Sequence, residues 1–289
     1  MSAVHNKEGS LGSVKAEVKS AGQKAAFNPV MEALTRVGYG ARGLIYFTMG
    51  LLALNVALGN GSGATDQQGA ITAIGRQPAC LILLWAILLG LVSYSLWGVI
   101  RAVFDPLHKG NDLKGLVTRA AFLFSAASYA ILIMPTYSFI KGAGSAGQGG
   151  AQTQQSLASI MSKPWGPWAI GIVGLVVIAA GLYQIYQGIN TSFDRQFKTY
   201  AMTAQEVKVA IQLGRFGTAT RGLLIAVIGF LLVLAAYHSN SSQAVGFDAA
   251  LTAMRNQPGG VWLLGIAAIG LMAFGIYSAL SAAWFRLKR

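Results

Sequence analysis

Long apolar runs alternate with short polar segments along most of the 289-residue chain. Six of the runs are long enough to cross the hydrocarbon core of a bilayer, which takes about 20 helical residues. They cover approximately residues 37–58, 79–103, 117–140, 167–189, 217–237 and 260–284. The runs are too long for barrel strands, and backbone groups in lipid must all be hydrogen-bonded, so the pattern predicts six transmembrane helices. The expected fold class is all-α.

The composition supports an integral membrane protein. Charged residues make up 11% of the chain and hydrophobic residues 54%, whereas about a quarter of a soluble domain is charged. The net charge is +13, but the basic residues flank apolar runs and are not interleaved with a soluble aromatic platform. Nucleic acid is therefore not an expected partner. The single cysteine, Cys80, excludes an intrachain disulfide and a cysteine-based metal cluster.

Lysine and arginine are distributed unevenly between the two sides of the predicted bundle. The N-terminal segment, the second and fourth loops and the C-terminus hold 18 of the 22. The positive-inside bias therefore predicts that both termini are cytoplasmic. Residues 1–31 form a cytoplasmic tail, which is either an amphipathic helix on the anionic inner leaflet or mostly disordered.

The chain contains three copies of one unit. The odd-numbered runs are preceded by Arg36-Val-Gly-Tyr-Gly-Ala-Arg42-Gly, by the weaker Gly115-Leu-Val-Thr-Arg119-Ala, and by Arg215-Phe-Gly-Thr-Ala-Thr-Arg221-Gly. The even-numbered runs are preceded by short amphipathic segments that end in a proline, at positions 70–78, 156–164 and 250–258. A tyrosine recurs within each even-numbered run at a similar distance from that proline, at Tyr94, Tyr183 and Tyr277.

Each unit is therefore a hairpin of two transmembrane helices with a short outer helix between them. The units occupy residues 32–106, 107–196 and 197–289. Because each has an even number of spans, successive copies enter the membrane in the same direction and are parallel repeats. A pseudo-threefold bundle is the simplest arrangement, with the short outer helices in the interface or tucked between the hairpins.

The motif Gly-Tyr-Gly-Ala-Arg-Gly at residues 38–43, followed by an outer helix, a proline and a glycine-rich even run, resembles the bacterial membrane family called domain of unknown function 1206. That family typically carries the two-helix unit three times, and the resemblance covers roughly residues 32–287. The first and third copies match best, whereas the middle copy lacks the glycines around Arg119. The resemblance implies a bacterial plasma (inner) membrane protein and brings no activity, substrate or catalytic residue.

Arg42, Arg119 and Arg221 stand one or two turns inside the cytoplasmic start of the odd runs. Three roles are open to them. They contact lipid phosphates or an anionic ligand, they are snorkelling anchors that fix the orientation, or they stack on the recurrent tyrosine of their own hairpin. A structural role is the expected one.

Arg76, Lys163 and Arg255 fall near the ends of the three short outer helices, where a positive charge complements the helix dipole. In a pseudo-threefold bundle they would form a loose basic ring, which could attract anions to a central opening. This ring is a second candidate site for lipid or anion contact.

The residues that usually carry chemistry are dispersed. All nine acidic residues lie outside the apolar runs or at their edges, so an ion-coupled carrier would lack its usual machinery. The three histidines are too far apart in the pattern to ligate one metal or haem. We expect no cofactor, no metal and no enzymatic activity. Several polar residues inside the runs could line a path or join helices by hydrogen bonds: Thr48, Asn55, Ser93, Ser125, Ser128, Gln184 and Ser278.

Two functions follow as expectations. The first is a non-enzymatic scaffold, assembly or lipid-organising protein, whose partners are the bilayer, anionic lipids of the cytoplasmic face and an unidentified membrane protein. The alternative is a small-solute or anion channel or facilitator along the axis between the three hairpins, which requires a continuous polar path.

Overall fold

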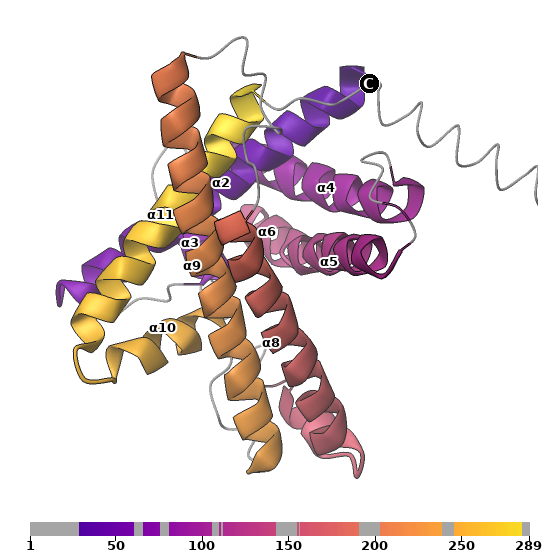
Figure 1. Ribbon diagram of the computed structural model, residues 1–289, viewed down its shortest axis with the longest axis vertical. Helices are drawn as coiled ribbons and strands as arrows, with labels where there is room; N and C mark the ends of the chain where they lie inside the picture. Colours follow the sequence, from indigo (N-terminus) through magenta and orange to yellow (C-terminus); the bar gives the residue numbers. More distant parts are fainter. Residues whose placement is uncertain are drawn as a thin grey trace, which may run out of the picture.

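All the regular structure in the described part of the chain is helical (Figure 1). The computed structural model describes residues 29–60, 66–75, 81–105, 110, 112–142, 155, 157–190, 203–238 and 246–284. Six helical segments in these ranges are long and apolar enough to cross a membrane. The predicted fold class and the six spans are therefore confirmed. The tail at residues 1–28, Arg76 and Cys80 lie outside the described residues.

Five of the spans are single helices and one is broken. The single helices are α2 (Pro29–Ala57), α4 (Leu81–Phe104), α8 (Gly166–Asn190), α9 (Ala204–Tyr237) and α11 (Gly260–Trp284). The third span consists of α5 (Leu113–Ala130) and α6 (Ile133–Ile140). Pro135 explains the break, because it cannot donate a backbone hydrogen bond to the carbonyl of Ile131 and its ring disfavours a continuous helix there.

Two helices begin well before their apolar runs. α2 starts at Pro29, where the missing N–H is not needed and the fixed φ favours a helix. α9 starts after a capping box, in which the Thr203 hydroxyl accepts from Glu206 N at 3.3 Å and Thr203 N donates to Glu206 Oε2 at 2.7 Å. Hydropathy marks the part of a helix that suits lipid, whereas the cap marks where the helix begins.

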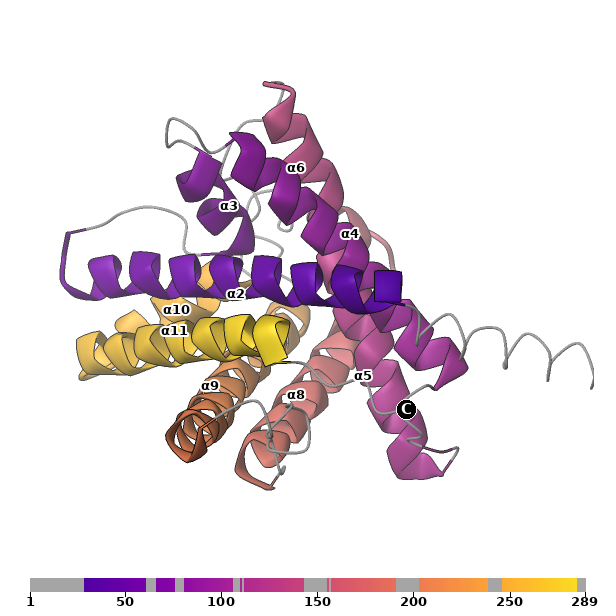
Figure 2. The same cartoon turned by 90° about the horizontal axis from the view of Figure 1, so that it is seen from above.

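The long helices form three antiparallel pairs between repeats, α11 on α2, α4 on α5, and α8 on α9, while α2 also packs on α4 and α9 on α11 within their own repeats. The pairs run at wide angles to one another in Figure 1, and α2 and α11 lie side by side in Figure 2 as well. In every pair the even helix of one repeat packs on the odd helix of the next. This cyclic order is the one that a pseudo-threefold arrangement requires.

Glycines set the register of two of these pairs. In α8/α9, a Cβ on Gly181 would lie 2.7 Å from the carbonyl oxygen of Gly222. In α11/α2, a Cβ on Gly275 would lie 2.8 Å from the carbonyl oxygen of Gly43. Gly181 and Gly275, in the even helices, stand at the same distance from the proline of their own repeat. Gly222 and Gly43, in the odd helices, directly follow the arginine of their own repeat. The two pairs therefore use the same positions, where only glycine lets the backbones approach so closely.

The α4/α5 pair differs because these glycines are absent. The equivalent positions hold Ser95 and Ala120. The helices instead meet at Gly98, where an added Cβ would lie 2.7 Å from the Cβ of Ala126, and Ser95 Oγ donates to Ala126 O at 3.0 Å. The loss of glycines in the middle copy thus has a structural consequence at this interface.

The two outer helices that the structure describes completely are tucked into the bundle. They are α3 (Gln67–Gly75) and α10 (Phe247–Arg255). Ala70 and Ala250 are fully buried, and Ile71 and Leu251 are nearly so. α3 packs on α2, α4 and α6, so it lies between two repeats, whereas α10 packs mainly on α9 and α11 of its own repeat.

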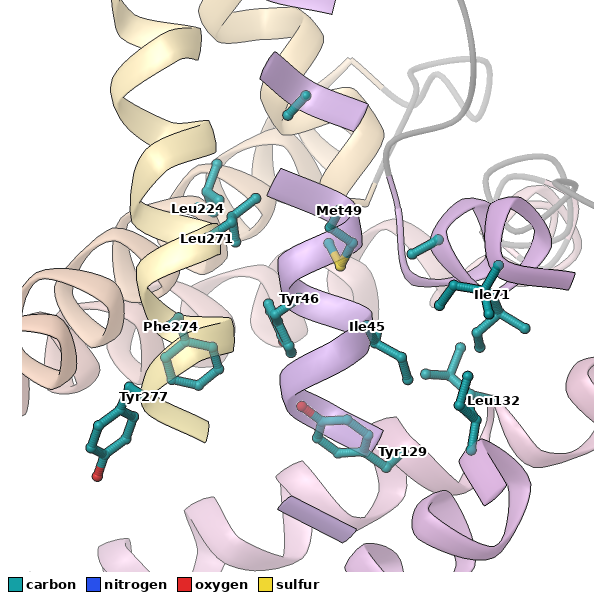
Figure 3. Packing of buried hydrophobic residues seen from close by; sticks show 14 of the residues in the cluster. Ile45, Tyr46, Met49, Ile71, Tyr129, Leu132, Leu224, Leu271, Phe274 and Tyr277 are labelled. Atoms are coloured by element: carbon teal, nitrogen blue, oxygen red, sulfur yellow. The ribbon is translucent and has the colours of Figure 1, made fainter. Parts of the chain in front are cut away.

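Aromatic side chains fill the centre of the largest hydrophobic cluster. Figure 3 shows Tyr46 of α2 lying between Phe274 of α11 and Tyr129 of α5. The rings of Tyr46 and Phe274 meet edge to face with centroids 4.8 Å apart, a preferred aromatic geometry. Aromatic rings therefore fill the region where the helices meet, and they lie around the polar groups described next.

Candidate functional site

A chain of alternating guanidinium groups and aromatic rings runs through the centre of the bundle. Arg101 Cζ lies 5.6 Å from the Tyr94 centroid, and Arg42 Cζ lies 5.2 Å from the same ring. Arg42 Cζ is also 4.3 Å from the Phe274 centroid, and Arg221 Cζ is 5.3 Å from it. Arg221 Cζ completes the chain 5.5 Å from the Tyr46 centroid. We call these six residues the arginine–aromatic stack.

All six spans contribute to this region. The stack itself comes from α2, α4, α9 and α11. α5 adds Phe122, whose ring centroid lies 4.4 Å from Arg101 Cζ, and α8 adds Gln184, whose Oε1 accepts from Arg221 Nη1. The stack therefore lies where the three repeats meet.

Neutral groups hold the two repeat arginines of the stack. Arg42 Nη1 donates to the Tyr94 hydroxyl, and Arg221 Nε donates to the Tyr46 hydroxyl at 2.8 Å. Every hydrogen bond and ring contact found for Arg42 and Arg221 in the described part of the chain is to a tyrosine, phenylalanine or glutamine, never to a carboxylate. The acidic residue nearest in sequence to Arg101 is Asp105, whose Oδ2 accepts from Gly110 N at 2.9 Å.

This arrangement concentrates positive charge inside the protein. Arg42 and Arg221 lie against one ring, so their charges are within about 10 Å of each other and repel by about 1–2 kcal/mol at an effective dielectric constant of roughly 20. A desolvated cation–π contact contributes about 2 kcal/mol, which offsets part of the free-energy cost of burying these charges. The stack can therefore exist without an anion, and an anion placed beside it would lower its electrostatic energy.

Both odd helices of the stack continue well beyond their repeat arginine. α2 continues from Arg42 to Ala57 and α9 from Arg221 to Tyr237, which is about 22–24 Å of helix in each case. This is slightly less than the ~30 Å hydrocarbon core. To span the whole core, each helix also needs about one turn before its arginine. The side chains of Arg42 and Arg221 contact Phe274 of a neighbouring helix.

Arg119 occupies the equivalent position in the middle repeat but does not reach the stack. Its Nε donates to the carbonyl of Ala102 at 2.7 Å and its Nη2 to that of Val103 at 3.1 Å. These carbonyls belong to the last turn of α4 and have no partner within the helix. Arg119 therefore caps a helix C-terminus, where a cation is favourable.

The predicted stacking on the tyrosine of the same hairpin is found for Arg42 and Tyr94. Tyr183 is instead hydrogen-bonded to Thr118, with the hydroxyl oxygens 3.0 Å apart. In the third repeat the ring beside Arg221 is Phe274. Phe274 and Tyr94 stand at the same distance from the prolines of their repeats, whereas Tyr277 stands nearly one turn further along. The distance from the repeat proline, and not the recurrence of tyrosine, therefore identifies which ring is equivalent in each repeat.

Sequence reasoning missed Tyr46, Phe274 and Arg101 as members of this region. Tyr46 follows Arg42 by four residues and so shares its helix face. Phe274 could have been found from the proline register. Arg101 stands at the end of the second apolar run, and the structure places it in the last turn of α4, where it is only 6% exposed.

The other candidate residues are not brought together here. Lys163 and Arg255 are exposed, and Arg76 lies outside the described residues, so the outer basic ring stays a prediction. Of the polar residues within the spans, Ser93 and Ser128 donate to carbonyls of their own helices, whereas Gln184 joins the arginine–aromatic stack. In the described residues no group of three histidine, cysteine, aspartate or glutamate side chains is arranged to hold a metal ion.

These features define a class: a multi-pass helical membrane protein built from three two-helix repeats, with arginines buried among aromatic rings at their junction. The model of the family described as Domain of Unknown Function (DUF1206) matches the chain three times, over residues 37–105, 115–190 and 216–284. The chain belongs to this family, as its repeated motifs predict.

A curated bacterial relative extends the comparison. The chain is 31% identical over 255 residues to the "Uncharacterized protein YxxB" of Bacillus subtilis (strain 168), a match that covers 88% of this chain and 91% of that protein. No solved structure matches the chain.

Proposed function

We propose that this protein is a non-enzymatic, lipid-organising membrane protein that binds an oxyanion of the phosphate or carboxylate type at the arginine–aromatic stack. The observation that carries the proposal is the convergence of Arg42, Arg101 and Arg221 inside the spans, with the contacts found for Arg42 and Arg221 in the described residues all made to neutral groups. Ionisable side chains within membrane spans are expensive and usually mark a functional site.

Unused hydrogen-bond donors indicate which ligand fits. Among the residues that the structure describes, the Nε atoms of Arg42 and Arg101 are buried and have no hydrogen-bond partner. A guanidinium group presents its N–H donors in a planar fork that matches carboxylate and phosphate oxygens. Buried donors without acceptors are costly. An oxyanion beside these arginines would satisfy the donors and supply the missing negative charge.

The predicted orientation strengthens the lipid-organising role. With both termini in the cytoplasm of a bacterial cell, the stack lies in the inner leaflet of the plasma membrane. Anionic head groups are attracted by basic pockets between helices on that side. A further membrane-protein partner is compatible with this role.

The alternative of an anion channel or facilitator has one supporting observation. Gln67 Nε2 donates to the Tyr46 hydroxyl at 3.3 Å, and the same hydroxyl accepts from Arg221. Polar groups thus connect the outer helix α3 to the stack. Binding is favoured over conduction because Tyr46 is fully buried and packed between other rings. Anion flux into proteoliposomes that is abolished in Y46F would favour the facilitator.

Native mass spectrometry of the purified protein tests the binding proposal. We expect phosphatidylglycerol to bind more tightly than phosphatidylcholine, and R42Q and R221Q each to weaken phosphatidylglycerol binding about tenfold, equivalent to ~1.4 kcal/mol. R119Q is the matched control, because the same change is made at the same repeat position outside the stack. The proposal fails if folded R42Q and R221Q bind as wild type does, or if R119Q loses as much.

A further inference from the structure

The two long helices of the middle repeat do not close on each other. In the first and third repeats, α2 packs on α4 and α9 packs on α11, whereas α5 and α8 barely touch. The closed hairpins meet at Gly90 and Gly270, where an added Cβ would overlap Ala41 and Thr220 respectively. The two glycines stand at the same distance from the prolines of their repeats. The equivalent residue in α8 is Val176, whose branched side chain is 59% exposed.

The corresponding face of α8 is less well covered as a result. Three positions at fixed distances from the repeat proline are buried in both α4 and α11. They are Gly90, Tyr94 and Trp97 in α4, and Gly270, Phe274 and Tyr277 in α11. In α8 the same positions hold Val176, which is exposed, and Ala180 and Tyr183, which are half-buried. We refer to the region between α5 and this face of α8 as the α5/α8 seam.

The seam leads directly to the arginine–aromatic stack. Phe122 of α5 packs against Arg101, and Gln184 of α8 accepts from Arg221. Between these residues, the Thr118 and Tyr183 hydroxyls join α5 to α8. Near the stack the seam contains the polar groups of Gln184, Thr118 and Tyr183, whereas Val176, two turns before Gln184 in α8, is apolar. The seam is therefore amphipathic along its length.

We propose that the ligand is a two-chain anionic lipid, whose head group binds at the stack while an acyl chain lies in the α5/α8 seam. This inference rests on the proposed function and names its ligand. A lipid that enters the seam laterally from the bilayer keeps its acyl chain in hydrocarbon, and only its head group meets the arginines. Val176 then keeps the repeat open, because it prevents the close helix approach that glycine permits in the other two repeats.

Photolabelling in phosphatidylcholine nanodiscs tests this placement. The probes are phosphatidylglycerol and phosphatidylcholine that carry the same diazirine in the middle of one acyl chain. We expect phosphatidylglycerol to label peptides from α5 and α8 at least fivefold more than phosphatidylcholine does. R221Q should remove this enrichment. V176G should reduce it, because α5 and α8 can then approach, while binding of chain-free glycerophosphoglycerol is retained.

Three results would overturn the placement. Equal labelling by both lipids would show that the seam is ordinary lipid-facing surface. Competition by glycerophosphoglycerol as effective as that by unlabelled phosphatidylglycerol would identify a free anion as the ligand. Dimers formed by a photoreactive side chain at position 176 would show that a second copy covers the seam. If R42Q and R221Q leave head-group binding unchanged, the proposed function itself fails, whatever the labelling pattern.

Discussion

The α8/α9 and α4/α5 pairs stand at equivalent places in the cyclic order, but they are packed differently. Gly181 and Gly222 bring α8 and α9 into backbone contact, whereas Ser95 and Ala120 hold the corresponding positions of α4 and α5. The difference extends to the arginine that precedes the odd-helix position, because Arg221 reaches the stack and Arg119 does not. Replacement of these two glycines therefore accompanies a different helix register and a different partner for a nearby charge.

Adding one methyl group to each pair tests this difference most directly. At Gly181 and Gly275 an added Cβ would overlap backbone atoms, so we expect Gly181→Ala and Gly275→Ala each to lower the free energy of unfolding by about 1–3 kcal/mol. Gly98→Ala should cost less than half as much, since fewer atoms are overlapped there. Steric-trapping measurements in bicelles give these values.

Gly265→Ala is the control for these substitutions. A Cβ at Gly265 of α11 meets nothing within 4 Å, so alanine should be neutral or slightly stabilising through its better helix propensity. A cost at Gly98 equal to that at Gly181 would show that α4 and α5 are as closely packed as the glycine-lined pairs.

A second test concerns the cap at the end of α4. Arg119→Gln removes two charged donors from the carbonyls of Ala102 and Val103, and we expect a loss of about 1–2 kcal/mol of unfolding free energy. Arg119→Lys retains the charge and should lose less. Unfolding in denaturing detergent, monitored by tryptophan fluorescence, measures both. A wild-type transition for Arg119→Gln would contradict the capping role.

The smallest expected effect is a pH dependence of the unfolding free energy, which distinguishes the first and third repeats from the middle one. Burial raises the pKa of the Asp66 carboxyl, and the charge of Asp248 adds to it, against the hydrogen bond from Gly69 N. A raised pKa means that the folded state holds the proton more tightly than the unfolded chain. The stabilisation is complete below the ordinary pKa of 3.8 and is lost as the pH rises through the raised value.

The unfolding free energy should therefore fall as the pH rises above about 4, and Asp66→Asn should remove that part of the slope. Asp248→Asn should remove a smaller part. Asp112→Asn, at the exposed N-cap of α5, makes the same chemical change in the middle repeat and serves as the control. An unchanged slope in Asp66→Asn would exclude Asp66 as its source.

The six spans, the three repeats and the position of each repeat arginine could all be predicted from the sequence. Apolar length identifies which segments suit lipid, and the cap at Thr203 and the proline at Pro29 are local signals for helix starts. Even the absence of glycines around Arg119 is visible in the pattern. These properties are local, because each depends on residues that are close together in the chain.

The pairing of the helices and the contact between Arg221 and Tyr46 were decided by the tertiary structure alone. Arg221 donates a hydrogen bond to Tyr46, from which it is separated by 175 positions in the sequence. No local pattern specifies such a contact. The partner of each charge depends on the helix register, which is set by steric fit between two surfaces at once. A single methyl or a branched side chain, as at Ala120 or Val176, shifts that fit, so three similar sequences form two equivalent interfaces and a third that differs.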